Sequence, residues 1–291
     1  MYTLKHDHLK ATVNPVGAEL SSLLCNGTEL MWQGDEQFWT GRAPILFPIV
    51  GALKDGTMTF RGKHYELPRH GIARHATFET FEQSDSSVSM RLTADEKTLQ
   101  VYPWDFELQV HFSLRRSGLE ICYDIYNRDS SDMLYTIGSH PAFALEINNQ
   151  YSFSDYEIAF DQPESLATYS LNEDGLLDTE PHSFACAGTG NATIRLSEEI
   201  FNDDALVFRD INSRQVSLHR DGKVLLTVDT GGAPHLGIWA KPGAPFVCIE
   251  PWFGTSDFID SNGDFETKPD LHKLAPQQKS SHTVAVTAKA E

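Results

Sequence analysis

Short stretches in which apolar and polar residues alternate recur along the whole chain, and turn residues separate them. Because side chains of a strand point alternately to its two faces, a period of two predicts half-buried β-strands. We expect strands at residues 9–14, 20–25, 57–60, 63–67, 87–93, 106–114, 119–126, 214–218, 223–228, 236–239, 246–249 and 281–288. Short strands at such regular spacing are typical of an antiparallel sandwich or barrel.

Turn residues support this interpretation. Arg61-Gly62 and Ser117-Gly118 each stand between two expected strands, and Asn26-Gly27, a strong hairpin signal, ends the strand expected at residues 20–25. Helical patterns are scarce, and only residues 169–177 and 198–201 are expected to hold a turn or two of helix. We therefore predict an all-β fold: one domain over residues 1–291, built as a large antiparallel two-sheet β-sandwich with few short helices.

The charge balance excludes some partners. Acidic residues number 41 and basic residues 23, which gives a formal charge of −18. Nucleic-acid binding needs a basic face, so neither a nucleic acid nor an anionic membrane surface is expected as a partner. No apolar stretch approaches the ~18 residues of a membrane helix, and the first residues do not resemble a signal peptide. The four cysteines form no CxxC motif, so we expect free thiols and a cytoplasmic location.

Two stretches carry cations that a plain sandwich does not need. Residues 39–56 form an apolar run broken by Pro44 and Pro48, which excludes a regular central strand, and Arg42 and Lys54 flank the run. The alternative is a buried edge segment with two solvated cations. Residues 67–74 place His70 between two arginines at the end of an expected hairpin. It could be a surface residue, but loops carry function more often than strands do.

Two further stretches place a histidine and a carboxylate beside apolar residues. Pro141 forces His140 into an extended conformation, and Gly138 allows close approach of the backbone. A core histidine bonded to a carbonyl is the alternative. Glu250 ends an apolar run beside Trp252, and burial there would raise its pKa toward the range useful for general acid–base catalysis.

Several familiar chemistries lack their motifs. The chain contains no GxSxG elbow, Walker loop or HExxH sequence, and Gly188-Thr-Gly190 lacks the third glycine of a dinucleotide fingerprint. A calcium-like loop at residues 260–264 has Phe265 where glycine is needed and Leu271 where glutamate is needed. We therefore expect no metal and no cofactor.

Five motifs in order resemble the aldose 1-epimerase (galactose mutarotase-like) family, specifically its LacX-type branch. They are Ala43-Pro-Ile-Leu-Phe-Pro-Ile-Val-Gly51, Leu67-Pro-Arg-His-Gly-Ile-Ala-Arg74, Gly138-Ser-His-Pro-Ala-Phe143, Asp204-Ala-Leu-Val-Phe208 and Cys248-Ile-Glu-Pro-Trp252. The resemblance implies a β-supersandwich fold and interconversion of the α and β anomers of an aldose. It also implies a small sugar as the partner, and we expect a homodimer.

The resemblance assigns roles by motif. His140 corresponds to the family's general acid and Glu250 to its general base, while His70 corresponds to a second histidine that binds and polarises the sugar. Asp204 stands where an aspartate bonds sugar hydroxyls, although the adjacent Asp203 leaves this alignment open by one residue.

One position departs from the family pattern. Many members have an arginine where this chain has Ala52, so Arg42, Lys54 or Arg74 is expected to supply the cation instead. Trp239 and Trp252 lie near Glu250 in the sequence and are the tryptophans we expect to stack on a sugar ring.

Two other functions stay open at this point. A hexose 6-phosphate could replace the free hexose as substrate, since arginine suits phosphate binding. Alternatively, the protein could bind carbohydrate without turnover. The loop at residues 178–191 matches no motif, and the sequence does not identify the sugar.

Overall fold

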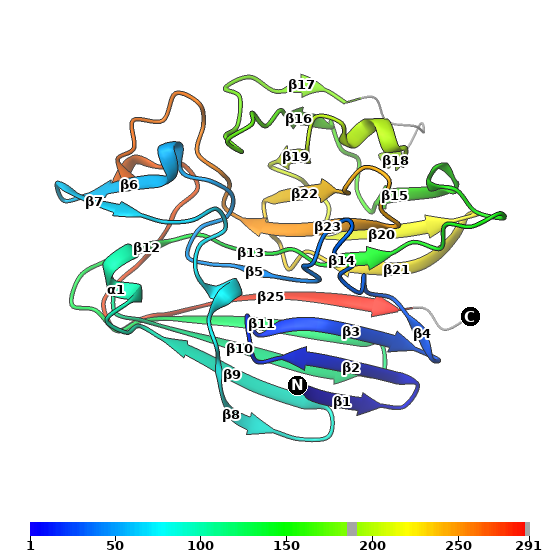
Figure 1. Ribbon diagram of the computed structural model, residues 1–291, viewed down its shortest axis with the longest axis horizontal. Coiled ribbons are helices and arrows are strands. Elements are labelled where there is room, and N and C mark those ends of the chain that lie inside the picture. Colours follow the sequence, from blue (N-terminus) through cyan, green and yellow to red (C-terminus); the bar gives the residue numbers. More distant parts are fainter. Residues whose placement is uncertain (185–190, 289–291) are drawn as a thin grey trace.

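A computed structural model describes residues 1–184 and 191–288, and antiparallel strands are the main secondary structure in these ranges (Figure 1). An N-terminal sheet begins the chain, and its strands follow one another in sequence order. It consists of β1 (Tyr2–His6), β2 (Leu9–Asn14), β3 (Glu19–Cys25) and β4 (Thr28–Glu29). As expected, Asn26-Gly27 forms the turn between β3 and β4, and both of its residues have positive φ, at 50° and 84°.

A second, long sheet gathers strands from distant parts of the chain. Its order is β18 (Thr193–Arg195), β15 (Tyr156–Phe160), β20 (Gln215–Arg220), β21 (Lys223–Asp229), β25 (Lys279–Ala288), β11 (Gly118–Asn127), β10 (Phe106–Arg115), β9 (Ser87–Thr93) and β8 (Glu79–Gln83). In β10 the buried Leu108, Val110 and Phe112 alternate with half-buried Gln109 and His111. The predicted period of two is confirmed there.

The third sheet, here called the cavity sheet, carries Trp239, Glu250 and Trp252 of the candidate site. Its order is β17 (His182–Ser183), β16 (Ala167–Tyr169), β19 (Leu206–Arg209), β22 (His235–Trp239), β23 (Phe246–Phe253), β13 (Ile137–Ser139) and β5 (Ile45–Leu46), and β14 (Ala142–Ala144) also pairs with β23. The proline-broken segment thus supplies only the short strand β5 at the end of this order, as Pro44 and Pro48 predict.

Small elements complete the described chain. Two strand pairs join β6 (Thr57–Phe60) to β7 (Lys63–Glu66) and β12 (Met133–Tyr135) to β24 (His272–Leu274). The helical elements are α1 (Thr98–Val101) and the 3₁₀ helices η1 (Lys54–Gly56), η2 (Ala73–His75), η3 (Phe153–Asp155), η4 (Glu198–Phe201) and η5 (Phe265–Thr267). The helix expected at residues 198–201 is confirmed as η4.

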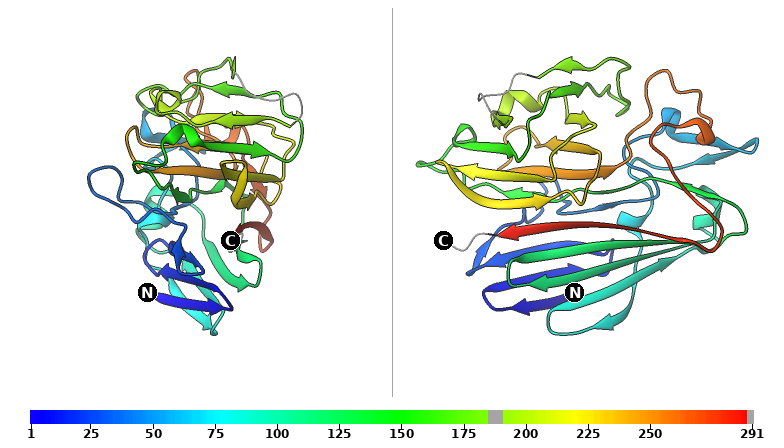
Figure 2. Two further views of the ribbon diagram at one scale, coloured as in Figure 1. Left: turned by 90° about the vertical axis from the view of Figure 1, so that its right-hand side faces the viewer. Right: turned by 180° about the vertical axis from the view of Figure 1, so that it is seen from behind.

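The sheets stack in layers around shared cores. The long sheet is the layer that contacts both of the others. Its strands β9 and β10 contact β1 of the N-terminal sheet. Near the other end of the long sheet, Phe160 of β15 packs edge-on against Phe208 of β19 in the cavity sheet. Figures 1 and 2 show the cavity sheet on one side of β25 and the N-terminal sheet on the other. The predicted antiparallel sandwich is confirmed, with three principal layers where two were expected.

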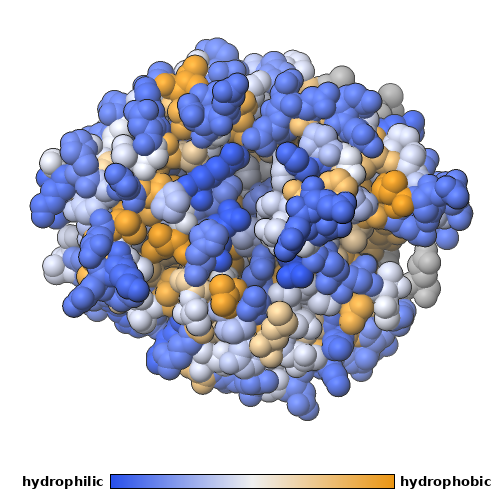
Figure 3. Space-filling view, viewed as in Figure 1, coloured by the Kyte–Doolittle hydropathy of each residue, from blue (hydrophilic) through white to orange (hydrophobic). Residues whose placement is uncertain are grey.

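The face of the molecule shown in Figure 3 is mostly polar. On the face in Figure 3, hydrophilic residues predominate and apolar residues form small separate groups. No helix within the described ranges has the length and apolarity to cross a membrane. Of the expected free thiols, Cys25, Cys122 and Cys248 are unpaired, and Cys186 lies outside the described residues.

The central strand β23 extends further than its sequence pattern predicts. The expected strand ends at Ile249, before Pro251, whereas β23 continues to Phe253. On one side β14 pairs with β23 up to Cys248, and β13 resumes the pairing only at Trp252. Pro251 therefore lies at a break in the ladder, where its missing N–H costs no strand–strand hydrogen bond.

A network of charges ties the end of the cavity sheet to the loop that follows β23. Arg209 Nη2 donates to both carboxylate oxygens of Asp270 at 2.9 and 2.8 Å, and Thr255 donates to Oδ2 at 3.0 Å. His235, which pairs with Trp252, places Nε2 at 3.5 Å from the same oxygen. Although partial burial alone would raise the pKa of Asp270, His235 and Arg209 hold it well below its ordinary value.

We expect Asp270→Asn to lower the free energy of unfolding by about 3 kcal/mol at neutral pH, because Arg209 and His235 lose their anionic partner. The lowered pKa of Asp270 stabilises the fold above the carboxylate's ordinary pKa, and this stabilisation is lost as the pH falls. In urea titrations, the difference in free energy of unfolding between variant and wild type should therefore be smaller at about pH 3 than at neutral pH.

A matched control is Asp132→Asn, which removes an exposed ion pair to Lys273. This change should cost less than about 1 kcal/mol. An Asp270→Asn deficit no larger than that of the control at neutral pH would contradict a stabilising role for the network.

Candidate active site

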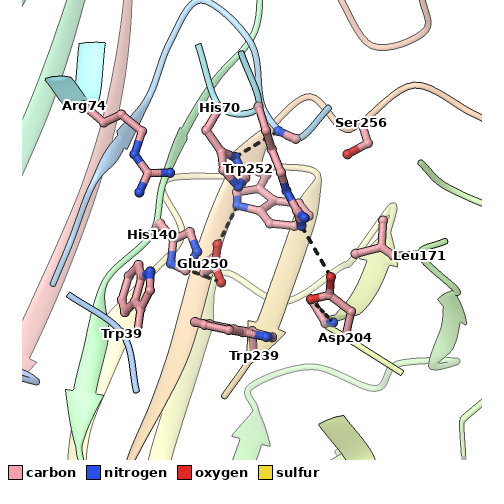
Figure 4. A pocket seen from close by; sticks show the side chains of 13 residues that line it. Trp39, His70, Arg74, His140, Leu171, Asp204, Trp239, Glu250, Trp252 and Ser256 are labelled. Atoms are coloured by element: carbon pink, nitrogen blue, oxygen red, sulfur yellow. Dashed lines mark hydrogen bonds and ion pairs between the residues drawn. The ribbon is translucent and has the colours of Figure 1, made fainter. Parts of the chain in front are cut away.

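A cavity of about 290 Å³ opens over the cavity sheet. This volume lies near the lower end of the ~300–1,000 Å³ typical of small-molecule sites. The residues that line it, most of which Figure 4 labels, include both charged or polar side chains and aromatic rings. They belong to Trp39, Gly51, Arg69, His70, Arg74, His140, Leu171, Asp204, Ala205, Trp239, Glu250, Trp252 and Ser256.

The register of the strands places His140 and Glu250 opposite each other. Gly138 of β13 pairs with Trp252 of β23, and Ala142 of β14 pairs with Cys248. Both registers place residue 140 opposite residue 250, since 138 + 252 and 142 + 248 give the same sum. His140 lies in the short break between β13 and β14, and its backbone N–H donates to Pro44 O at 3.1 Å. The break lets its imidazole face Glu250.

His140 and Glu250 form a buried pair. His140 Nδ1 lies 3.3 Å from Glu250 Oε1, and the two side chains are 10% and 1% exposed. Burial, aided by the nearby Arg74, lowers the pKa of His140 to about 3. Burial also raises the pKa of Glu250 well above its ordinary value. Each shift disfavours a charge on that group alone, so the two groups favour a state in which they share one proton.

Two glycines make room for the indole that contacts this pair. Trp252 Nε1 donates to Glu250 Oε2 at 3.2 Å. A Cβ atom at Gly237 would stand 2.5 Å from this indole, and one at Gly138 would stand 2.8 Å from it. Glycine at both positions therefore lets the indole lie flat on the sheet beside the carboxylate.

Aromatic rings enclose His140. The Trp39 ring stacks on the imidazole with centroids 4.9 Å apart and planes 25° apart, and Trp239 meets it edge-on at 5.8 Å. These rings exclude water from one side of the imidazole, which strengthens electrostatic interactions at the pair. They also offer apolar surface on which a sugar ring can stack.

His70 is held in one tautomer by the backbone. The backbone N–H of His70 donates to Gly51 O at 2.7 Å. The ring atom Nδ1 of His70 accepts from the backbone N–H of Gly51 at 3.1 Å. Burial and the charges of His140, Arg69 and Arg74 lower the pKa of His70 well below its ordinary value, so the ring is neutral. With Nδ1 accepting, the ring proton lies on Nε2, where it can be donated to a ligand. His70 reaches this position with φ of 68°, which is uncommon for a residue with a side chain.

Charged groups occupy opposite sides of the cavity. Arg69 Nη2 lies 3.6 Å from Asp204 Oδ2, and both side chains are partly exposed. Arg74 lies on the side of His140, whereas Asp204 and Leu171 lie across from it (Figure 4). The cavity thus presents hydrogen-bond donors at Arg69, Arg74 and His70, and an acceptor at Asp204.

The structure brings most of the predicted site residues together. The cavity is lined by His70, Arg74, His140, Asp204, Trp239, Glu250 and Trp252. Of the two neighbouring aspartates left open by the sequence, Asp204 lines the cavity.

Arg42 and Lys54 do not line it, contrary to expectation. The Arg42 guanidinium donates to Gln33 O at 2.7 Å, and Lys54 Nζ donates to Ser261 O at 3.0 Å. These carbonyl groups hold the two cations elsewhere. Ala52, whose N–H donates to Ser256 Oγ, is buried and also lies outside the lining.

Trp39, Arg69, Leu171 and Ser256 also line the cavity but were not predicted. Trp39 and Arg69 stand at the edge of motifs that the sequence does single out, but nothing in the pattern indicates where their side chains point. Leu171 follows β16 in a segment expected to be helical. That expectation is wrong: Leu171 and Leu177 form an isolated antiparallel bridge across a turn.

Cys248 lies next to the acid–base pair. It stands two residues before Glu250 in β23, so both side chains point to the same face. The ligand atoms of His140, Cys248 and Glu250 lie within 4.8 Å of one another, and these residues could hold a metal ion.

Known proteins share this fold and sequence over nearly the whole chain. The family model described as aldose 1-epimerase matches residues 1–285. The chromosomal and plasmid forms of protein LacX from Lactococcus lactis subsp. lactis are each 30% identical over 295 residues, covering 98% of both chains. A galactose mutarotase related enzyme from Lactobacillus acidophilus is 31% identical with a TM-score of 0.92, over 99% of this chain and 97% of the other. A galactose mutarotase-like protein from Lactobacillus casei ATCC 334 is 26% identical with a TM-score of 0.93, over 99% and 100%.

Proposed function

Because the chain belongs to the aldose 1-epimerase family, we propose that it is a mutarotase that interconverts the α and β anomers of a hexose. The observation that carries this proposal is the buried pair of His140 and Glu250 facing each other on the floor of one cavity. Opening a cyclic hemiacetal requires an acid at the ring oxygen and a base at the anomeric hydroxyl, and this pair supplies both.

The proposed reaction conserves the proton count of the pair. With the shared proton on His140, the imidazolium donates it to the ring oxygen while ionised Glu250 removes the proton from the anomeric hydroxyl. The bond between the anomeric carbon and the ring oxygen breaks, and the anomeric oxygen becomes the carbonyl oxygen of the open chain. Rotation about the C1–C2 bond presents the other face of the carbonyl. Reversal of both proton transfers then closes the ring and leaves one proton on the pair.

The other lining groups are proposed to bind and orient the sugar. Neutral His70 donates from Nε2 to a sugar hydroxyl, and Asp204 and Arg69 bond hydroxyls on the far side of the cavity. The indoles of Trp239 and Trp252 offer faces against which the pyranose can pack. Holding the sugar close to both proton-transfer groups adds to the rate by removing the entropic cost of their encounter.

A hexose 6-phosphate is the second candidate substrate, and one observation favours it. Arg69 and Arg74 both line the cavity, where guanidinium groups could bind a phosphate. Arg69, however, already faces Asp204 at 3.6 Å, which offsets part of its charge. We therefore propose the free hexose as the main substrate.

Polarimetry with freshly dissolved pure anomers tests the proposal and decides between the substrates. Glucose, galactose and glucose 6-phosphate should be compared at low and high salt. Faster turnover of free sugars with little salt dependence supports the main proposal. Strong preference for the phosphosugar, weakened by salt, would support the second. Binding of sugar with no acceleration of mutarotation would instead indicate a carbohydrate-binding protein.

Trp252→Phe should move the acidic limb of the pH profile of kcat/KM toward higher pH by about one unit. The indole N–H bonds the ionised form of Glu250 and so lowers its pKa. Phenylalanine keeps an aromatic ring but loses this donor, so the pKa of the carboxyl rises and its base form is lost at a higher pH.

Trp239→Phe is the matched control. Trp239 lines the same cavity and meets His140 edge-on, but the indole N–H that donates to Glu250 is that of Trp252. It should weaken sugar binding and leave the acidic limb in place. Equal displacement of the limb in both variants would contradict the role given to the Trp252 hydrogen bond.

A further inference from the structure

Three buried side chains at and beside the cavity lining are of the types that bind borderline-soft metals, and two of them, His140 and Glu250, line the cavity. His140, Cys248 and Glu250 offer an imidazole nitrogen, a sulfur and a carboxylate oxygen within 4.8 Å of one another, and all three residues are buried. Zinc sites are built from these donor types, and a site with three protein ligands keeps a fourth position for water or another small ligand. Mutarotation uses two of the three groups and gives no role to the thiol.

The distance between two of the ligand atoms suits a tetrahedral ion. Ligands at about 2.0–2.2 Å from zinc stand about 3.3–3.5 Å apart along a tetrahedral edge. His140 Nδ1 and Glu250 Oε1 are 3.3 Å apart. Although this oxygen is so close, Nδ1 is buried and makes no hydrogen bond in the described part of the chain. A metal ion bound between the two residues would give this nitrogen a partner.

Exchange of protons for a divalent cation leaves the buried charge unchanged. With one proton on the His140–Glu250 pair and one on the Cys248 thiol, the three groups are neutral in total. A divalent ion bound by neutral imidazole, carboxylate and thiolate also gives zero net charge, and two protons leave. A bare cation would be repelled by Arg69, by Arg74 and by the dipole of neutral His70, and the neutral total charge of the bound site limits this repulsion. Asp204, across the cavity, attracts the cation.

We infer that His140, Cys248 and Glu250 form a binding site for zinc or a similar divalent cation, and that this ion inhibits the enzyme reversibly. The bound ion would occupy the lone pairs that accept and release protons, so proton transfer to and from the sugar would stop. The inhibition rests on the proposed function, whereas the metal binding does not.

Cobalt(II) binding to the full chain tests the site without any activity measurement. We expect about one cobalt ion per chain, release of about two protons on binding and a thiolate-to-cobalt charge-transfer band in the near ultraviolet. Added zinc should abolish the band. Cys248→Ser should remove the band and weaken metal binding at least about tenfold, since loss of a group that only orients a ligand already costs about 10–100-fold.

Cys122→Ser is the matched control, because Cys122 lies on β11 with its sulfur 3.7 Å from Asp124 Oδ1 and is less buried than Cys248. It should keep the band and the affinity. Absence of cobalt binding in the wild type would overturn the inference. So would a thiolate band that survives Cys248→Ser or disappears in Cys122→Ser.

Inhibition is measured separately by polarimetry with zinc alone. Wild type and Cys122→Ser should lose activity at the same zinc concentration, and Cys248→Ser should require at least about tenfold more. Metal binding without measurable mutarotation in any sample would leave the site standing and count against the proposed function. Binding at the three residues with undiminished mutarotation would contradict the inhibitory role.

Discussion

Glu250→Gln is expected to lower kcat for mutarotation by about 10²–10⁴-fold, the usual contribution of one positioned proton-transfer group. Glutamine keeps the size of the side chain and can still accept the hydrogen bond from Trp252, but it cannot remove the proton from the anomeric hydroxyl. Exchange NMR between the two anomers measures the rate at equilibrium. Equal exchange rates for variant and wild type would exclude Glu250 as the base.

Binding and stability should be affected far less than the rate. Because Glu250 is 1% exposed and its pKa is raised by burial, an uncharged amide should fit without a large loss of stability. Glu107→Gln is a suitable control, since Glu107 is also a buried carboxylate but lies on β10 and pairs with Arg128. It should lower stability and leave kcat unchanged. Calorimetry should show that Glu250→Gln still binds sugar.

His140→Asn is expected to produce a second loss of about 10²–10⁴-fold, because the ring oxygen is then left without its proton donor. The two residues share one proton, so their effects should not multiply. The double variant should be about as slow as the slower single variant, as is found for groups that act as a unit. Fully multiplicative effects would indicate two independent roles.

The control for His140 is another buried histidine. Counted over the whole residue, His282 and His140 are each 8% exposed, and burial lowers the pKa of His282 to about 4. However, Nε2 of His282 lies 3.1 Å from the Tyr135 hydroxyl, and His282 does not line the cavity. His282→Asn should reduce stability through this lost contact and keep kcat near that of the wild type. A similar loss of kcat in both variants would show that burial of a histidine, and not its position, decides the effect.

Local pattern predicts strands well and misses what depends on a neighbouring strand. The alternation in residues 87–93 gives β9 with its observed bounds, because every second side chain, at Val88, Met90 and Leu92, is buried in one core. The end of β23 cannot be read in the same way, since Pro251 is tolerated only through the break between β13 and β14. Residues 169–177 fail for a related reason: Leu171 and Leu177 pair with each other, and Leu177 also bridges to Phe258.

The candidate site shows the same division. Motif resemblance indicates His140 and Glu250, but their direct opposition follows from a pairing of strands about 110 residues apart, which no local pattern reveals. The positions of the cations are less predictable still. Arg42 and Lys54 were expected in the cavity and lie outside it, whereas Arg69 was not expected there and lines it. A guanidinium on a long flexible side chain reaches several places from one backbone position, so tertiary contacts decide where it points. The expected homodimer and cytoplasmic location stay predictions.

Exchange NMR of a free hexose with the wild type and the His140→Asn/Glu250→Gln double variant tests the central claim most directly. We predict that the wild type transfers magnetisation between the α and β anomers far faster than buffer alone. The double variant, at equal concentration and with sugar bound, should be at least about 10²-fold slower than the wild type. Equal transfer by both proteins would contradict the claim that this pair opens the sugar ring.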